Sequence, residues 1–218
     1  MSKRSYNQYC AVARALDIVG ERWTLLVVRE LLTGPKRFKD LLGGLSGIGT
    51  NLLSARLKDL EKHGIVRRTT LPPPAGSNVY ELTELGWLLE PVIVALSRWG
   101  AKFLSDPRQE DNLRSAWAVV AMRSALEPKV ASEIRETYEF RIDEEAFHVR
   151  VEDGEAKAWQ GPAVEPDLVI RGDTRAFLAL AAGQLRPAEA LESGEIQADG
   201  SQDALALCLK MFESSAVS

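Results

Sequence analysis

A repeat of leucines marks a helix in the first half of the chain. Leu53, Leu57 and Leu60 follow one another at intervals of four and three residues, which places all three on one side of a helix. The side chains between them are largely polar or charged and lie mostly away from that side. This pattern predicts a short helix that presents its polar side to a partner.

Both ends of this helix carry recognisable signals. Thr50 is a suitable N-cap because its hydroxyl can accept a hydrogen bond from a free backbone N–H, and Gly49 is the alternative at that position. Gly64 follows the last turn and readily adopts the left-handed conformation in which many helices end. A predicted strand begins directly afterwards and runs into the basic pair Arg67 and Arg68.

The surrounding pattern predicts a winged helix-turn-helix. In the segment that precedes Gly34 and Pro35, apolar residues at helical spacing are expected to point inward; these are Trp23, Leu26, Val27 and Leu31. After the leucine-bearing helix, two short apolar segments flank a proline-rich turn, as in a β-hairpin. The predicted elements are helices over 7–19, 20–35 and 36–45, and strands over 65–71 and 79–82 joined by a loop over 72–78.

A long apolar stripe follows the predicted hairpin. From Thr83 to Phe103, apolar residues keep helical spacing for more than five turns, and Pro91 should bend or break the helix that carries them. Such a stripe must be covered. It packs either on the core of its own chain or, in the interpretation we favour, on a second copy together with the first helix.

The character of the chain changes after the segment "SDPRQED", residues 105–111. Alternating apolar and polar positions in "TYEFRI" and "FHVRV" predict strands, and helical segments lie before and after them. We expect two domains, residues 1–104 and residues 105–218, the second an α+β arrangement of a helix, antiparallel strands and closing helices.

Charge is divided unevenly between these two parts. The chain of 218 residues has a net charge of −4, but residues 1–104 carry +6 and the remainder −10. This asymmetry indicates that the first part meets an anion, although chance variation of the surface would also produce it. The two cysteines are too few for a disulfide framework, and no secretory signal or membrane-spanning run is evident. We therefore expect a cytoplasmic protein.

Several long motifs occur in order in the first part: Cys10, "IVGERWTLLVVREL", "GPKRF", "LLSARLKDLEKHGIV", "YELTELG" and "LLEPVIVALSRWG". Over about residues 8–104 the chain thereby resembles the HxlR family of bacterial regulators, relatives of the MarR family. The resemblance implies a DNA-binding homodimer. The loop at 72–78 departs from the pattern because its tip has no Lys or Arg, which leaves Arg67 and Arg68 at its base as the better phosphate ligands.

The second part contains "VRVEDGEAKAWQG", "PDLVIRGDTRAFLALAAGQLRPAEAL" and "GEIQADGSQDALALCLKMF". These segments resemble the sterol carrier protein type two fold, chiefly over residues 136–212. The resemblance implies an apolar tunnel between a sheet and helices that would hold a hydrophobic small-molecule effector. Aromatic residues at these positions equally fit an ordinary core. The candidate lining residues are Trp117, Phe140, Phe147, Trp159, Phe177 and Met211.

Double-stranded DNA is the expected partner of the predicted helix at 50–62, because a helix fits the major groove of about 12 Å. Two copies would read half-sites roughly 34 Å apart, which predicts a partly palindromic operator. The candidates for base contacts are Thr50, Asn51, Ser54, Ala55 and Lys58. Phosphate contacts position the protein on DNA but do not read its base sequence. The candidates for them are Lys36, Arg37, Lys39, Arg56, Arg67 and Arg68.

Other chemistry finds less support in the sequence. Family members include thiol-based sensors with a cysteine near Cys10, where Arg14 would favour a thiolate, but a small residue at a dimer seam is an equal alternative. His63 and His148 are the only histidines and lack the spacing of a metal site. No catalytic motif appears, so we expect neither an enzyme nor a cofactor.

The sequence thus predicts a homodimeric transcription regulator, a repressor in preference to an activator, because occupation of an operator is enough to block a promoter. The alternative is a protein that binds a lipid or another hydrophobic ligand and whose winged helix serves protein contacts. Salt-dependent DNA binding would distinguish the two.

Overall fold

The computed structural model describes residues 5–71, 76–104, 117, 120, 134–153, 155–181 and 183–213. The chain forms two compact units, Met1–Ile93 and Val94–Ser218, which are treated separately below. Helix α6 (Glu90–Ala101) runs across the division between them. The domain boundary expected after Leu104 stays a prediction.

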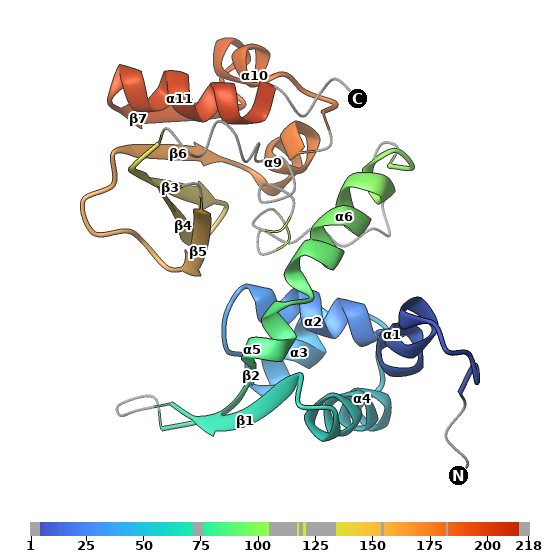
Figure 1. The fold of residues 1–218 in the computed structure, drawn as a ribbon. Helices are drawn as coiled ribbons and strands as arrows, with labels where there is room; N and C mark the ends of the chain where they lie inside the picture. Colours follow the sequence, from blue (N-terminus) through green and yellow to red (C-terminus); the bar gives the residue numbers. More distant parts are fainter. Residues whose placement is uncertain are drawn as a thin grey trace. The chain divides into compact units, whose positions relative to one another are not determined.

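The first unit has the element order of a winged helix-turn-helix, as expected (Figure 1). Strands β1 and β2 pair antiparallel, and Lys36 extends this small sheet through two backbone hydrogen bonds with Tyr80 of 2.8 and 2.9 Å. The elements are α1 (Ala11–Val19), α2 (Thr24–Leu32), α3 (Phe38–Gly44), α4 (Thr50–Lys62), β1 (Val66–Thr70), β2 (Asn78–Leu82) and α5 (Glu84–Trp87).

Helix α4 follows the predicted pattern closely. Leu53, Leu57 and Leu60 are completely buried, and Gly64 has the expected left-handed conformation with φ of 68°. The N-cap is Gly49, so Thr50 is the first residue of the helix and its hydroxyl makes no capping bond. Gly49, the alternative to Thr50 at the N-cap, is therefore the correct assignment.

Helices α1 and α2 are shorter than their patterns suggested. Before α1, the Ser5 hydroxyl and the Tyr6 N–H both donate to the Asp17 carboxylate, which keeps residues 5–10 out of the helix. Leu26 is 39% exposed, so the prediction that it points inward is wrong. It lies about 100° around the helix from the buried Val27, because each residue of a helix turns by that angle.

Pro91 stands where the predicted long helix divides into α5 and α6, as the sequence indicated. Thr83 caps α5: its hydroxyl accepts a hydrogen bond from the Gly86 N–H at 3.1 Å. The same hydroxyl donates to the carbonyl of Gly64 at 2.5 Å and lies 3.2 Å from that of Ile65. The start of α5 is thereby joined to the turn that ends α4.

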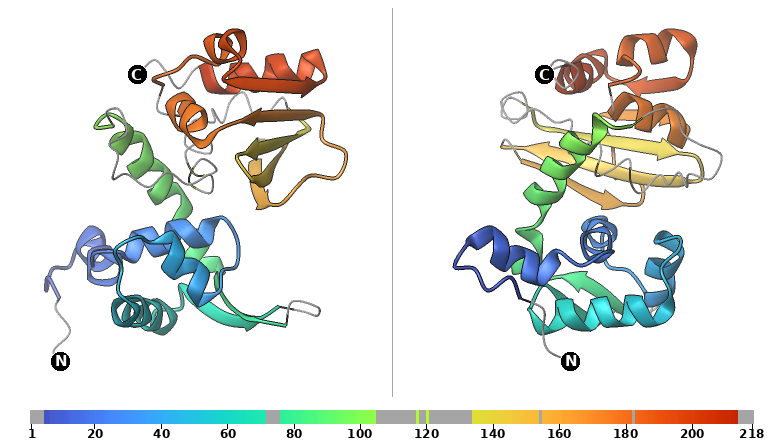
Figure 2. Two further views of the ribbon diagram at one scale, coloured as in Figure 1. Left: turned by 180° about the vertical axis from the view of Figure 1, so that it is seen from behind. Right: turned by 90° about the vertical axis from the view of Figure 1, so that its right-hand side faces the viewer.

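The second unit contains a five-stranded sheet with the order β5-β4-β3-β6-β7 (Figure 2). Strands β3 and β6 pair parallel, which corrects the expectation of purely antiparallel strands. All other neighbours are antiparallel. The elements are β3 (Glu136–Ile142), β4 (Glu145–Glu152), β5 (Glu155–Gln160), β6 (Leu168–Gly172), α9 (Thr174–Ala181), α10 (Pro187–Ser193), β7 (Ile196–Gly200) and α11 (Gln202–Glu213).

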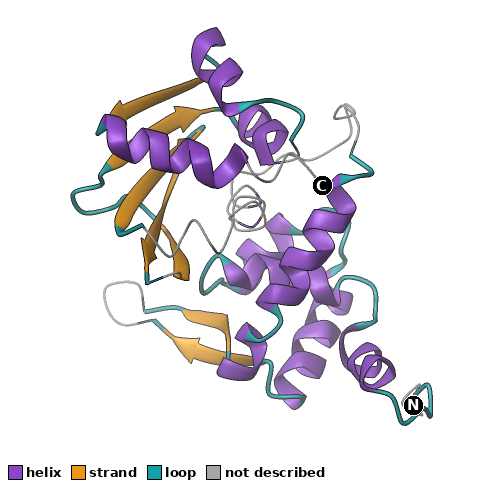
Figure 3. Ribbon diagram, turned by 45° about the horizontal axis from the view of Figure 1, so that its top comes forward, coloured by secondary structure: helices purple, strands orange, loops and turns teal. Residues whose placement is uncertain are grey.

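Alternate residues of β3 and β4 form the core of this unit, as the strand pattern predicted. Tyr138, Phe140 and Ile142 on β3 are buried beside Phe147, which lies opposite Phe140 in the register. Buried residues of α9, α10 and α11 belong to the same cluster, so the three helices cover one face of the sheet (Figure 3). The α+β fold of the second unit is thus confirmed.

Candidate nucleic-acid interface

The polar side of α4 is the most prominent candidate surface of the first unit. Its residues follow one another at helical spacing on the side opposite the buried leucines. The structure brings all five predicted base contacts together there. Ser54 is half-buried, and the exposed ones are Thr50, Asn51, Ala55 and Lys58.

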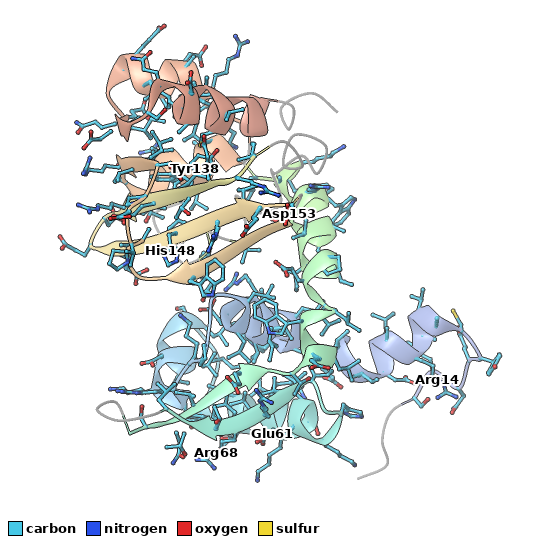
Figure 4. All side chains as sticks on the ribbon, turned by 60° about the vertical axis from the view of Figure 1, so that its left-hand side comes forward. Arg14, Glu61, Arg68, Tyr138, His148 and Asp153 are labelled. Atoms are coloured by element: carbon cyan, nitrogen blue, oxygen red, sulfur yellow. The ribbon has the colours of Figure 1, made fainter. Side chains whose placement is uncertain are left out.

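The two arginines at the base of the hairpin are both exposed but point to opposite faces of β1, because successive strand residues alternate. Arg67 forms an ion pair of 2.7 Å with Glu81 on β2. The guanidinium of Arg68 lies 5.6 Å from the centre of the Tyr80 ring (Figure 4). Residues 72–75 at the tip of the hairpin lie outside the described part of the chain.

The basic residues around α3 have different surroundings. Arg37 is the N-cap residue of α3, and its Nε donates to the Ser77 hydroxyl at 2.9 Å, which joins α3 to the hairpin. Lys36 is half-buried at the bridge to β2, whereas Lys39 is exposed. These three predicted phosphate contacts therefore lie at the junction of α3 with the hairpin.

Arg56 lies on α4 in an arrangement that differs from the one expected of a phosphate ligand. Only 15% of its side chain is exposed, and its guanidinium forms ion pairs with Glu21 at 3.0 Å and Asp59 at 3.6 Å. Its Nε also donates to the carbonyl of Arg22 at 3.2 Å. These bonds hold α4 against the segment that leads into α2, so Arg56 orients the helix.

Sequence reasoning missed the partners of Arg56. Glu21 lies 35 residues before it, and no local pattern connects the two. Trp23, next to this contact, has a left-handed backbone with φ of 79°, and the Arg22 guanidinium lies 5.3 Å from its ring centre. The indole also approaches Gly47, where an added Cβ would lie 3.7 Å away. A conformation so rare for a large residue could not be expected from spacing alone.

Cys10 is exposed at the N-cap position of α1. The backbone N–H groups of Ala13 and then Val12, at the start of this helix, lower the pKa of its thiol. Arg14, which was expected to favour the thiolate, pairs instead with Asp17 at 3.5 Å (Figure 4). The thiolate is therefore favoured by the start of the helix.

The second unit brings together three of the six candidate lining residues. The rings of Phe140 and Phe147 stack at 5.4 Å, and Phe177 meets Phe140 edge-on at 5.9 Å. Trp159 is 46% exposed and lies on the opposite face of the sheet, since its register partner is His148 and not a core residue. Trp117 is half-buried. Met211 belongs to α11, and its side chain lies outside the described part.

That opposite face of the sheet holds a second group of residues missed by sequence reasoning. The buried carboxylate of Glu139 accepts hydrogen bonds from Arg141 at 2.7 Å and from the Ala163 N–H at 2.8 Å. Burial alone would raise the pKa of Glu139, but these bonds outweigh it and lower the pKa. The ring of His148 stacks on Trp159 at 5.4 Å and lies 3.0 Å from the carbonyl of Gly161. All these groups have partners within the fold.

Within the described ranges, no three residues of the types His, Cys, Asp and Glu are grouped so that they could hold a metal ion. Among the helices of the described part, none is long and apolar enough to cross a membrane.

Two segments of the chain match known protein families. Residues 18–108 match the HxlR-like helix-turn-helix family, and residues 120–209 match the SCP-2 sterol transfer family. The HTH-type transcriptional regulator YodB of Bacillus subtilis is 37% identical over 89 residues, which cover 41% of this chain and 80% of the relative. The uncharacterized HTH-type transcriptional regulator sll1512 of Synechocystis sp. is 35% identical over 104 residues, 48% of this chain and 77% of the relative.

A solved structure of the reduced form of YodB from B. subtilis covers 46% of this chain and 100% of its own, with 33% identity and a TM-score of 0.39. These relatives are HTH-type transcriptional regulators, which supports a regulator that binds DNA. The chain therefore belongs to the HxlR-like helix-turn-helix family of DNA-binding transcriptional regulators, and its residues 120–209 match the SCP-2 sterol transfer family.

Proposed function

We propose that this regulator acts as a homodimeric repressor that inserts α4 into the major groove of a partly palindromic operator. The observation that carries the proposal is the division of α4 into a buried leucine side and an exposed polar side. Asn51 suits an adenine edge, whereas Thr50 and Ser54 accept several bases. A bound repressor would block a promoter by occupying it.

Phosphate contacts come from the basic residues on both sides of α4 in this proposal. Lys39 is exposed at α3, and Arg67 and Arg68 are exposed at the base of the hairpin. Because Arg67 and Arg68 point to opposite faces of β1, we expect them to contribute unequally. Arg56 is assigned a positioning role, since Glu21 and Asp59 already hold its guanidinium.

Exposed apolar side chains support the homodimer. Leu88, Val92, Leu96 and Trp99 are all exposed along the α5–α6 segment, and Val12 and Leu16 are exposed on α1. Large exposed apolar side chains of this kind are costly in water and mark an interaction site. We propose that a second copy of the chain covers it and so places two α4 helices on one operator.

The second unit is assigned a hydrophobic effector in this proposal. Its family match is to sterol transfer proteins, and the aromatic cluster of Phe140, Phe147 and Phe177 offers apolar surface between the sheet and the helices. An effector would regulate DNA binding only if it binds two states of the dimer with different affinity. Oxidation of the exposed Cys10 thiol is proposed as a second signal that regulates DNA binding.

The test is the salt dependence of binding to an operator selected from random DNA. Each phosphate contact contributes about 0.9 to the slope of log K against log salt. Arg67→Ala and Arg68→Ala should each weaken binding to all DNA sequences alike. Together they should reduce the slope of log K against log salt by one to two units. Arg135→Ala, an exposed arginine of the second unit paired with Asp153, is the matched control. A slope equal to that of the wild type in the double variant would remove both residues from the interface.

A further inference from the structure

The segment between α1 and α2, residues 20–23, contacts the helix-turn-helix at two separate points. One point lies on α4, where the guanidinium of Arg56 bonds to the Glu21 carboxylate at 3.0 Å and to the Arg22 carbonyl at 3.2 Å. The other lies at the turn before α4, where the Trp23 indole lies beside Gly47. Arg56 is about 9 Å along the axis from the first residue of α4. Contacts at two such points fix the direction of a helix as well as its position.

The backbone of segment 20–23 is itself held in place. The Gly20 N–H donates to the carbonyl of Leu16 at the end of α1, at 2.9 Å, and the Thr24 N–H donates to the carbonyl of Glu21 at 3.1 Å. Trp23 has a left-handed backbone with φ of 79°, which persists for a large residue only where the surrounding structure supports it. The segment is therefore a fixed support for α4.

The charge of Glu21 makes its role testable. Its side chain is 55% exposed, whereas that of its partner Arg56 is 15% exposed. A carboxylate bonded to a helix that enters the major groove would repel the phosphates of DNA, since charges interact over about 8 Å at physiological salt. On charge alone, the loss of Glu21 would strengthen DNA binding. If the carboxylate directs α4 through Arg56, its loss would weaken binding to the operator.

We propose that Glu21 is a positioning residue that strengthens operator binding, because it holds α4, through Arg56, in the direction in which the helix enters the major groove. The proposal rests on the proposed insertion of α4 and adds the contact that directs it. An acidic residue thereby favours the binding of a polyanion. The Arg56 guanidinium, occupied by this contact, does not bind phosphate.

The experiment measures the affinity of full-length Glu21→Ala for the selected operator and for a random-sequence duplex of the same length. Operator binding should weaken by about tenfold, because an exposed ion pair favours its own geometry by about threefold and each of the two copies loses one. Binding to the random duplex should stay unchanged or become slightly tighter. The slope of log K against log salt on the operator should equal that of the wild type, because no phosphate contact is lost.

Asp59→Ala is the matched control. The Asp59 carboxylate is 60% exposed and also pairs with Arg56, at 3.6 Å, so the variant removes the same charge from the same partner. Asp59 belongs to α4, however, and its pair with Arg56 cannot hold that helix against another segment. Operator binding should therefore not weaken. Glu21→Gln, which keeps an oxygen that accepts a hydrogen bond from Arg56, should recover most of the affinity lost in Glu21→Ala.

Three outcomes would overturn the role of Glu21. Tighter operator binding with a steeper salt slope in Glu21→Ala would show that the released Arg56 binds phosphate. Equal weakening on the operator and the random duplex, or the same loss in Asp59→Ala, would show that direction of the helix is not the cause. In an Arg56→Ala background, Glu21→Ala should cause no further loss, and an additive loss would contradict their coupling.

Two measurements on the same proteins complete the test. The melting temperatures of the Glu21 and Asp59 variants should stay close to that of the wild type, since exposed ion pairs contribute little to stability. Failure of the wild type to select any operator would overturn the insertion of α4 and this proposal with it. The outcomes for Glu21→Ala overturn the positioning role alone.

Discussion

The two cysteines of this regulator differ in the environment of their sulfur atoms. The Cys10 thiol is exposed and its pKa is lowered by N–H groups at the start of α1, whereas burial within the second unit raises the pKa of Cys208 to about 12. The thiolate is the reactive form. At neutral pH, iodoacetamide should therefore modify Cys10 in the folded protein and leave Cys208 untouched, as measured by mass spectrometry of peptides.

The pH dependence of this reaction provides its control. Because the pKa of Cys10 is lowered, its alkylation rate should rise to a plateau at a lower pH than that of Cys208 in the unfolded chain. Equal labelling of both cysteines in the folded protein would show that Cys208 is not enclosed as described. A midpoint for Cys10 at or above that of an unstructured thiol would remove the proposed effect of the helix start.

Among the proposed base contacts on α4, Asn51 has the side chain best suited to distinguish one base from another. Asn51→Ala should relax the base preference at one operator position in each half-site. The discrimination against the wrong base at that position should fall by about 1–3 kcal/mol. Binding-site selection followed by sequencing measures this preference. Asn78→Ala on β2, where the side chain accepts a hydrogen bond from Thr70, is the matched control and should leave the selected sequence unchanged.

At the scale of elements, the contact between α5 and the end of α4 depends on a missing side chain. A Cβ at Gly86 would lie 2.2 Å from the backbone carbonyl oxygen of Ile65, so the two segments would have to separate. Gly86→Ala should lower the free energy of unfolding by about 1–3 kcal/mol. Gly100→Ala, also in a helix but with nothing within 4 Å of the new Cβ, should raise it by about 0.5–1 kcal/mol.

Denaturant unfolding of both glycine variants measures these changes. Equal stability of the two would contradict the close approach of α5 to the turn at Gly64 and Ile65. The comparison is informative because both substitutions replace the same side chain in a helix, so their intrinsic propensity effects cancel.

The sequence predicted those elements whose signals lie within a few residues of one another. The position of α4 followed from three leucines and Gly64, and the division of α5 from α6 followed from Pro91. The parallel pairing of β3 with β6 was not predicted, since it joins strands separated by two others and depends on contacts far apart in sequence. The ion pair of Arg56 with Glu21 was missed for the same reason.

At the scale of the whole molecule, the proposed homodimer depends on the exposed apolar segment around α6. Trp99 is 63% exposed, and Trp99→Glu should place a charge in the proposed seam and dissociate the dimer. Sedimentation velocity would measure the change. Operator affinity should fall by about a hundredfold, because the two α4 helices would no longer bind as a linked pair.

Val164→Glu is the control for this experiment. Val164 is 91% exposed in the second unit, in the segment between β5 and β6, and the same change of charge there should leave the oligomeric state unaltered. A wild-type protein that sediments as a monomer while binding its operator tightly would contradict the dimer altogether.

The hydroxyl of Thr83 links the start of α5 to the end of α4. It bonds at once to the Gly86 N–H of α5 and to the carbonyl of Gly64 that closes α4. A tilt of α5 therefore displaces the carboxyl end of α4. In the proposed dimer, an effector that changes how two copies associate would also change the spacing between their α4 helices, and the match to a fixed distance between half-sites would be lost.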